Sequence, residues 1–98
     1  MTSFVFRNYG NQLGTRILGA RVRQSLLETI LSNNKVVLDF TGVDVVSNAF
    51  ADECIAKLLM EMSLADLKEK TTFAGLNELA KMNIALALKR RQISMTEN

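Results

Sequence analysis

Four carboxylates stand close together in the middle of the sequence, and they are the first residues that could do chemistry. Asp39 ends an apolar run and Asp44 follows it, while Asp52 and Glu53 open a helical pattern. Oxygen ligands of this kind suit Mg²⁺. A structural role explains them better: Asp52 and Glu53 stabilise a helix N-terminus, and Asp39 satisfies a turn. We favour the structural role, so the sequence predicts neither a metal nor a cofactor.

Three glycines before the first helical pattern suggest a phosphate-binding loop. Gly10, Gly14 and Gly19 are spaced differently from the dinucleotide fingerprint. The phosphate loop also needs a lysine and then a serine or threonine after its last glycine, whereas Ala20 and Arg21 follow Gly19. The sequence therefore predicts a flexible loop from Gly10 to Gly19.

Nucleophilic catalysis has few candidate residues. Cys54 is the single cysteine, so no disulfide forms within the chain, and there is no histidine to act as a base or metal ligand. Because nothing nearby would activate its thiol, Cys54 is expected to be buried and inert. We therefore expect a protein that is not an enzyme.

Charge and hydropathy bear on nucleic-acid binding and on the cellular location of the protein. The 98 residues have a net charge of +2, with basic groups at Arg16, Arg21 and Arg23 and at 89–91. This field is too weak to predict nucleic-acid binding, and a solvated face explains both groups. The N-terminal residues lack a signal-peptide pattern, and no apolar run reaches the ~20 residues of a membrane span. These features predict a cytoplasmic protein with no membrane contact.

Hydrophobic periodicity sets the elements that must position these residues. Short runs of β-branched and aromatic residues predict strands at 4–6, 36–40 and 71–74, and segments with a helical apolar periodicity separate them. The order β-α-β-α-β-α predicts an α/β fold whose mostly parallel sheet of three to four strands is packed by helices. A chain of this length makes one domain, from 1 to 98.

Apolar stripes and polar capping residues locate the first two predicted helices. The first, of about a dozen residues, has Val22, Leu26 and Ile30 on its inner side, where Leu27 and Leu31 widen the same stripe, and it ends at 32–34. The second begins at Ser47 or Asn48 and carries a Glu53–Lys57 pair four residues apart. Its expected inner residues are Ile55, Leu58, Leu59 and Met62.

Polar residues 63–70 predict a connector with at most one helical turn. Asn77 begins the last predicted helix. Its expected stripe comprises Leu79, Met82, Ala85 and Leu86. Lys89, Arg90 and Arg91 close this helix, where the dipole favours cations, and residues 92–98 form a loose tail.

The turn over 43–53 leads from a buried strand to a helix start. In parallel sheets this carboxyl edge is where sites usually lie. Phe50, among small residues, is either a core anchor or an exposed contact, and the usual burial of phenylalanine favours the core.

Two segments resemble a known family. Residues 36–43 (VVLDFTGV) followed by 47–53 (SNAFADE) resemble the STAS-like domain of unknown function, whose members are similar to the STAS domains of bacterial anti-sigma factor antagonists. The likeness extends from residue 14 through the last helix, and the strand-turn-helix run is its most specific part.

The resemblance implies a regulatory protein-binding module. In antagonists the turn carries Asp-Ser-Ser-Gly, and a partner kinase phosphorylates the second serine. The matching positions here are Ser47, Asn48, Ala49 and Phe50, so alanine stands at the phosphoacceptor position. A phosphate on Ser47 would be an alternative modification. The partner that the family implies is a GHKL-type kinase-like ATPase.

We place the expected partner-binding face on the strand-turn-helix segment around residues 39–57. Its candidate residues are Asp39, Ser47, Asn48, Ala49, Phe50, Asp52, Glu53 and Lys57. Two alternatives stay open: a small-ligand or nucleotide-binding accessory domain that uses the glycine loop and the carboxylates, and a self-associating subunit. The second needs exposed apolar residues among Val45, Val46 and Phe50, where a homodimer would form.

Overall fold

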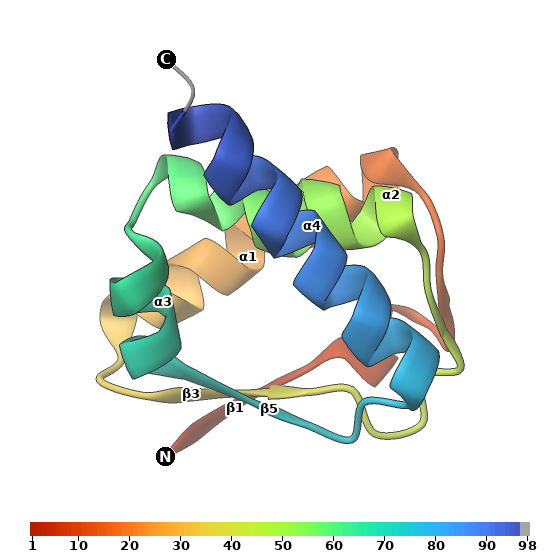
Figure 1. Ribbon diagram of the computed structural model, residues 1–98. Coiled ribbons are helices and arrows are strands. Elements are labelled where there is room, and N and C mark those ends of the chain that lie inside the picture. Colours follow the sequence, from red (N-terminus) through yellow and green to blue (C-terminus); the bar gives the residue numbers. More distant parts are fainter. Residues whose placement is uncertain (97–98) are drawn as a thin grey trace.

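Three parallel strands form the main sheet of the computed structural model, which describes residues 1–96 (Figure 1). Strand β3 (Val36–Asp39) lies between β1 (Thr2–Val5) and β5 (Thr71–Ala74). Phe4, Leu38 and Phe73 share one register row. The predicted α/β fold and parallel core sheet are confirmed.

All the labelled helices lie on one side of this sheet in Figure 1. Phe4, Val36 and Leu38 are buried, whereas Ser3 and Thr72, which point to the opposite face, are exposed. Alternation between the two sides of a strand explains this division. The sheet thus contributes one face to a single hydrophobic core.

A second, two-stranded sheet was not predicted. A short 3₁₀ helix, η1 (Phe6–Tyr9), leads to β2 (Gln12–Leu13), which pairs in parallel with β4 (Val45–Val46). The prediction of a flexible loop from Gly10 to Gly19 is therefore wrong. Two-residue strands leave no alternation to detect, and their pairing is between distant parts of the chain.

Helix α1 (Arg16–Ser32) is longer than the predicted dozen residues. The hydroxyl of Thr15 accepts a hydrogen bond from the Leu18 N–H at 3.1 Å, which caps the helix before Gly19. Val22, Leu26 and Ile30 are fully buried, as predicted, and Leu27 packs half-buried against the core. Leu31, which was predicted to widen the same stripe, is 65% accessible instead.

Gly19 lies where α1 crosses the second helical segment. A Cβ added at Gly19 would lie 2.9 Å from Cβ of Glu53 and 3.4 Å from the backbone N of Cys54. Because real Cβ contacts are longer, one of the two helices would have to move.

We expect Gly19→Ala to lower the free energy of unfolding by about 1 kcal/mol, even though alanine favours an isolated helix by a similar amount. Urea denaturation measures this change. Gly14→Ala is the control, because a Cβ there meets no atom within 4 Å. A Gly19→Ala protein more stable than wild type would contradict the packing explanation.

The second predicted helix is one helical segment with an irregular middle. It runs through α2 (Asn48–Phe50), a π-helical turn η2 (Ala51–Ile55) and a 3₁₀ helix η3 (Ala56–Met60). Ile55, Leu58 and Leu59 are buried as predicted, and Met62 is half-buried beyond the end of η3. The guanidinium of Arg23 donates to the Glu53 carbonyl oxygen at the irregular turn.

Residues 64–70 form a complete short helix rather than a connector with one turn. In α3 (Leu64–Lys70) the hydroxyl of Ser63 accepts a hydrogen bond from the Asp66 N–H, and Leu67 is buried. The polar composition hid this helix, whose packing against the core is made by the buried Leu67 and the half-buried Leu64.

Helix α4 (Glu78–Thr96) differs most from its prediction. Asn77 caps it as predicted: its side-chain Oδ1 accepts a hydrogen bond from the Ala80 N–H. The predicted inner stripe is exposed, with Leu79 and Met82 64% and 55% accessible and Ala85 and Leu86 also exposed. The buried residues are instead Ala80, Ile84 and Ala87.

Close packing explains this reversal. Helix α4 packs against η2 and η3, and small side chains in the contact let helices approach closely. A stripe predicted from hydrophobicity alone selects leucine and methionine instead. Residues 92–96 continue the helix, so neither the predicted closure at Lys89–Arg91 nor the tail from Gln92 is correct for these residues. Residues 97 and 98 lie outside the described part of the chain.

Candidate functional site

The turn before α2 is fixed by Ser47. Its hydroxyl donates to the Gly14 carbonyl oxygen at 2.9 Å and accepts from the Phe50 N–H at 3.0 Å, while its own N–H donates to the Leu13 carbonyl. The predicted N-cap role of Ser47 is confirmed. Since β2 pairs with β4 beside it, the long connection before α1 also holds this turn in place.

The next three residues divide between surface and core. Asn48 is exposed, Ala49 is half-buried, and Phe50 is 0% accessible. The interpretation of Phe50 as a core anchor is confirmed, so Phe50 leaves the candidate contact surface. Of the apolar residues proposed for self-association, Val46 and Phe50 are buried and Val45 is 45% accessible, which leaves no continuous patch there.

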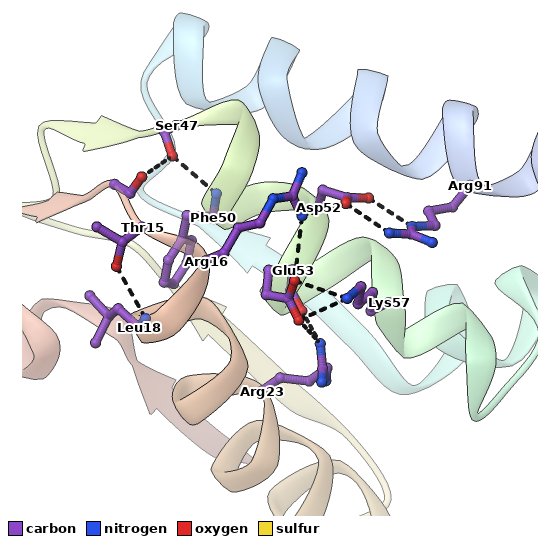
Figure 2. A network of polar contacts seen from close by, with 11 residues as sticks. Thr15, Arg16, Leu18, Arg23, Ser47, Phe50, Asp52, Glu53, Lys57 and Arg91 are labelled. Atoms are coloured by element: carbon purple, nitrogen blue, oxygen red, sulfur yellow. Dashed lines mark hydrogen bonds and ion pairs between the residues drawn. The ribbon is translucent and has the colours of Figure 1, made fainter.

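Asp52 joins the second helical segment to both α1 and α4 (Figure 2). Its carboxylate accepts two hydrogen bonds from Arg91, each 2.8 Å long, and one of 2.8 Å from Arg16. These guanidinium groups, Arg91 first, lower the pKa of Asp52 to about 2. Paired guanidinium–carboxylate contacts are strong and directional. Asp52 is therefore a fixed link between helices.

Glu53 is the buried carboxylate of the site. Its oxygens lie 2.9 Å from Lys57 Nζ, 2.8 Å from Arg23 Nη1 and 3.4 Å from Arg16 Nη1. Hydrogen bonds from Lys57 and then Arg23 overcome the effect of burial and lower the pKa of Glu53 to about 2. The predicted Glu53–Lys57 pair is confirmed, but Glu53 faces inward and its oxygens are occupied.

Asp39 and Asp44 lie apart from this pair. Asp39 accepts a hydrogen bond from the Thr41 N–H at 2.9 Å, and contacts with the Thr41 side chain and backbone lower the pKa of Asp39. Asp44 accepts from the Asn11 side chain at 3.2 Å. The predicted role of Asp39 in satisfying a turn is confirmed. Within residues 1–96, no three cysteine or carboxylate side chains are close enough together to hold a metal ion.

The arginines of the site were assigned to solvated faces in the sequence. Arg16 and Arg23 project from α1 and Arg91 from α4 toward the carboxylates of η2, as Figure 2 shows. One signal was present: Arg16 and Arg23 are seven residues apart, and so lie on one face of a helix that extends to residue 16.

A surface hollow adjoins the turn, and we name it the arginine pocket. It has a volume of about 360 Å³. Its polar lining residues are Arg16, Asn48, Asp52, Arg90, Arg91 and Ser94, with Ala49 and Ala87 between them. The pocket thus brings the exposed part of the predicted turn together with α1 and the last turns of α4.

Cys54 follows the two carboxylates and is fully buried. Burial raises the pKa of its thiol to about 12. Because the thiolate is the reactive form, we expect the native protein to react with a thiol reagent such as Ellman's at least about 100-fold more slowly than the unfolded protein. Equal rates in buffer and in denaturant would contradict this burial.

The comparisons with known proteins agree with the sequence resemblance. A family model described as a STAS-like domain of unknown function matches residues 19–80, more than half of the chain. The match runs from α1 through the turn to the first residues of α4. No curated protein and no solved structure matches the chain significantly. Among residues 1–96, no helix has the length and apolar character that crossing a membrane requires.

Proposed function

The chain belongs to the STAS-like domain family of unknown function, and on that premise we propose that it is a non-enzymatic regulatory module that binds another protein. The binding face in this proposal consists of Ser47, Asn48, Ala49 and the arginine pocket. Of the candidate residues predicted between 39 and 57, it keeps Ser47, Asn48, Ala49 and Asp52. The buried Phe50 and Glu53 are left out, as are Asp39 and Lys57, which do not line the pocket.

The way the turn is held supports this proposal: one side of the turn is fixed to the core and to neighbouring elements, and the other side lines the arginine pocket. Phe50 anchors it in the core, Ser47 ties it to Gly14, and Asp52 connects its helix to α1 and α4. Asn48 and Ala49 face the arginine pocket. A preorganised surface loses little conformational entropy when a partner binds.

A GHKL-type ATPase is the partner that we propose, because the family resembles anti-sigma factor antagonists. Ala49 replaces the phosphoacceptor, so binding in this proposal does not depend on a phosphorylation switch at that position. Ser47 is a poor substitute, since its half-buried hydroxyl already bonds Gly14 and Phe50. We place this interaction in the cytoplasm.

Affinity purification of the tagged chain from its native cells tests the proposal. We expect mass spectrometry to identify an ATPase of the GHKL type among the captured proteins, with a one-to-one complex after gel filtration. Asn48→Tyr, which adds bulk to the binding face, is expected to abolish capture. Gln24→Tyr is the control, because Gln24 is an exposed amide on α1 outside the pocket. Capture of the same ATPase by all three proteins would refute the proposed face.

A further inference from the structure

Only some of the polar side chains that line the arginine pocket form hydrogen bonds within the described part of the chain. Arg16 and Arg91 are held by Asp52, as described above. Arg90 also lines the pocket, and within the described residues it makes no hydrogen bond or ion pair. Asn48 and Ser94 are exposed there, likewise without a side-chain partner in residues 1–96. The unoccupied side chains can therefore all donate hydrogen bonds.

The charges that line the pocket also favour a negatively charged ligand. Three guanidinium groups line it, against the single carboxylate of Asp52. That carboxylate already accepts three hydrogen bonds from two of the arginines, so it offers little to a cation. Glu53 does not line the pocket, and it is shared among Arg16, Arg23 and Lys57. The pocket is thus suited to an acceptor with about two negative charges.

We propose that the arginine pocket is a binding site for a phosphate monoester. A phosphate group at neutral pH carries close to two negative charges and three terminal acceptor oxygens. Guanidinium groups that reach the pocket from α1 and α4 approach it from different helices, which matches a tetrahedral group better than a planar carboxylate. A volume of about 360 Å³ leaves room for the organic part that carries the phosphate.

Asp52 has a positioning role in this site. By binding Arg16 and Arg91 together it holds two side chains in place that would otherwise lose rotamer freedom when the ligand binds. Arg90 supplies the remaining cation, and its side chain is free to turn toward the ligand. The ester is carried either by a small molecule or by a phosphorylated residue of a protein. The site itself does not require the ATPase partner.

Heteronuclear NMR of the full ¹⁵N-labelled chain tests the site, with inorganic phosphate, phosphoserine and adenosine monophosphate as probes at constant ionic strength. We expect saturable shifts in residues that line the pocket, Asn48, Arg90 and Ser94 among them. Arg90→Gln should weaken phosphoserine or nucleotide binding by about tenfold, as the loss of a charge-assisted hydrogen bond implies. Lys89→Gln is the control: it removes the neighbouring charge of α4, which does not line the pocket.

The probes separate the sources of the ester. Tighter binding of phosphoserine supports a phosphorylated protein, and tighter binding of the nucleotide supports a small molecule. The proposal is overturned if no probe saturates, if both variants weaken binding equally, or if inorganic phosphate binds as tightly as the esters, which indicates an adventitious ion only. Since none of these outcomes uses the ATPase, failure here and failure of the proposed function are distinguishable.

Discussion

Truncation of Phe50 to alanine is expected to lower the free energy of unfolding by about 3–5 kcal/mol. The ring is fully buried beneath the turn, so its removal leaves a cavity that the surrounding core fills incompletely. Urea denaturation followed by circular dichroism measures the change. Phe50→Asp is expected to prevent folding altogether, because it places an unpaired charge in the core.

Phe73→Ala is the matched control for this truncation. Phe73 lies on the edge strand β5 and is 38% accessible, so we expect a loss of about 1–2 kcal/mol. Equal losses at the two positions would show that Phe50 does not anchor the turn. A folded Phe50→Asp protein would lead to the same conclusion.

Acidification is the second large effect. Asp52 and Glu53 have pKa values near 2 in the folded chain, against ordinary values of 3.8 and 4.5. Because the folded state binds these protons less tightly than the unfolded state, the stabilisation is complete above about pH 5. It is lost as the pH falls through 4 toward 2, by roughly 2–3 kcal/mol for each carboxylate.

Glu53→Gln identifies the source of this pH dependence. We expect it to be less stable than wild type at pH 6 and to approach wild type near pH 2, where the pH reaches the pKa of Glu53 in the folded chain and its stabilisation is largely lost. Glu28→Gln is the control, since Glu28 is exposed and forms no ion pair in residues 1–96. Stability profiles of wild type and Glu53→Gln that stay parallel from pH 6 to 2 would contradict the role of this carboxylate.

The strands of the main sheet, to within two residues at their ends, and most of the inner face of α1 could be predicted because their patterns are local. Val36 to Leu38 is a continuous apolar run, and Val22, Leu26 and Ile30 repeat with the period of a helix. The N-cap at Ser47 and the Glu53–Lys57 pair are also local features. Each depends on residues within one or two turns of one another, where sequence spacing determines the geometry.

The site could not be predicted in the same way, because it depends on contacts between distant residues. Arg91 reaches Asp52 from 39 positions away, and Arg16 from 36. From the sequence alone, a cation at the end of a helical pattern is explained equally well by the helix dipole and by an ion pair with a distant carboxylate. Helix α4 has apolar residues on several faces, so only its neighbours decide that Ala80 and Ile84 are buried rather than Leu79 and Met82.

Calorimetric titration of the captured ATPase with the purified chain tests whether the exposed turn and the arginine pocket form the binding face. We expect folded Asn48→Tyr to bind at least about 100-fold more weakly than wild type, as substitution at the centre of an interface does. Gln24→Tyr should bind as wild type does. Wild-type affinity in Asn48→Tyr, with its fold verified by circular dichroism, would contradict this placement of the face.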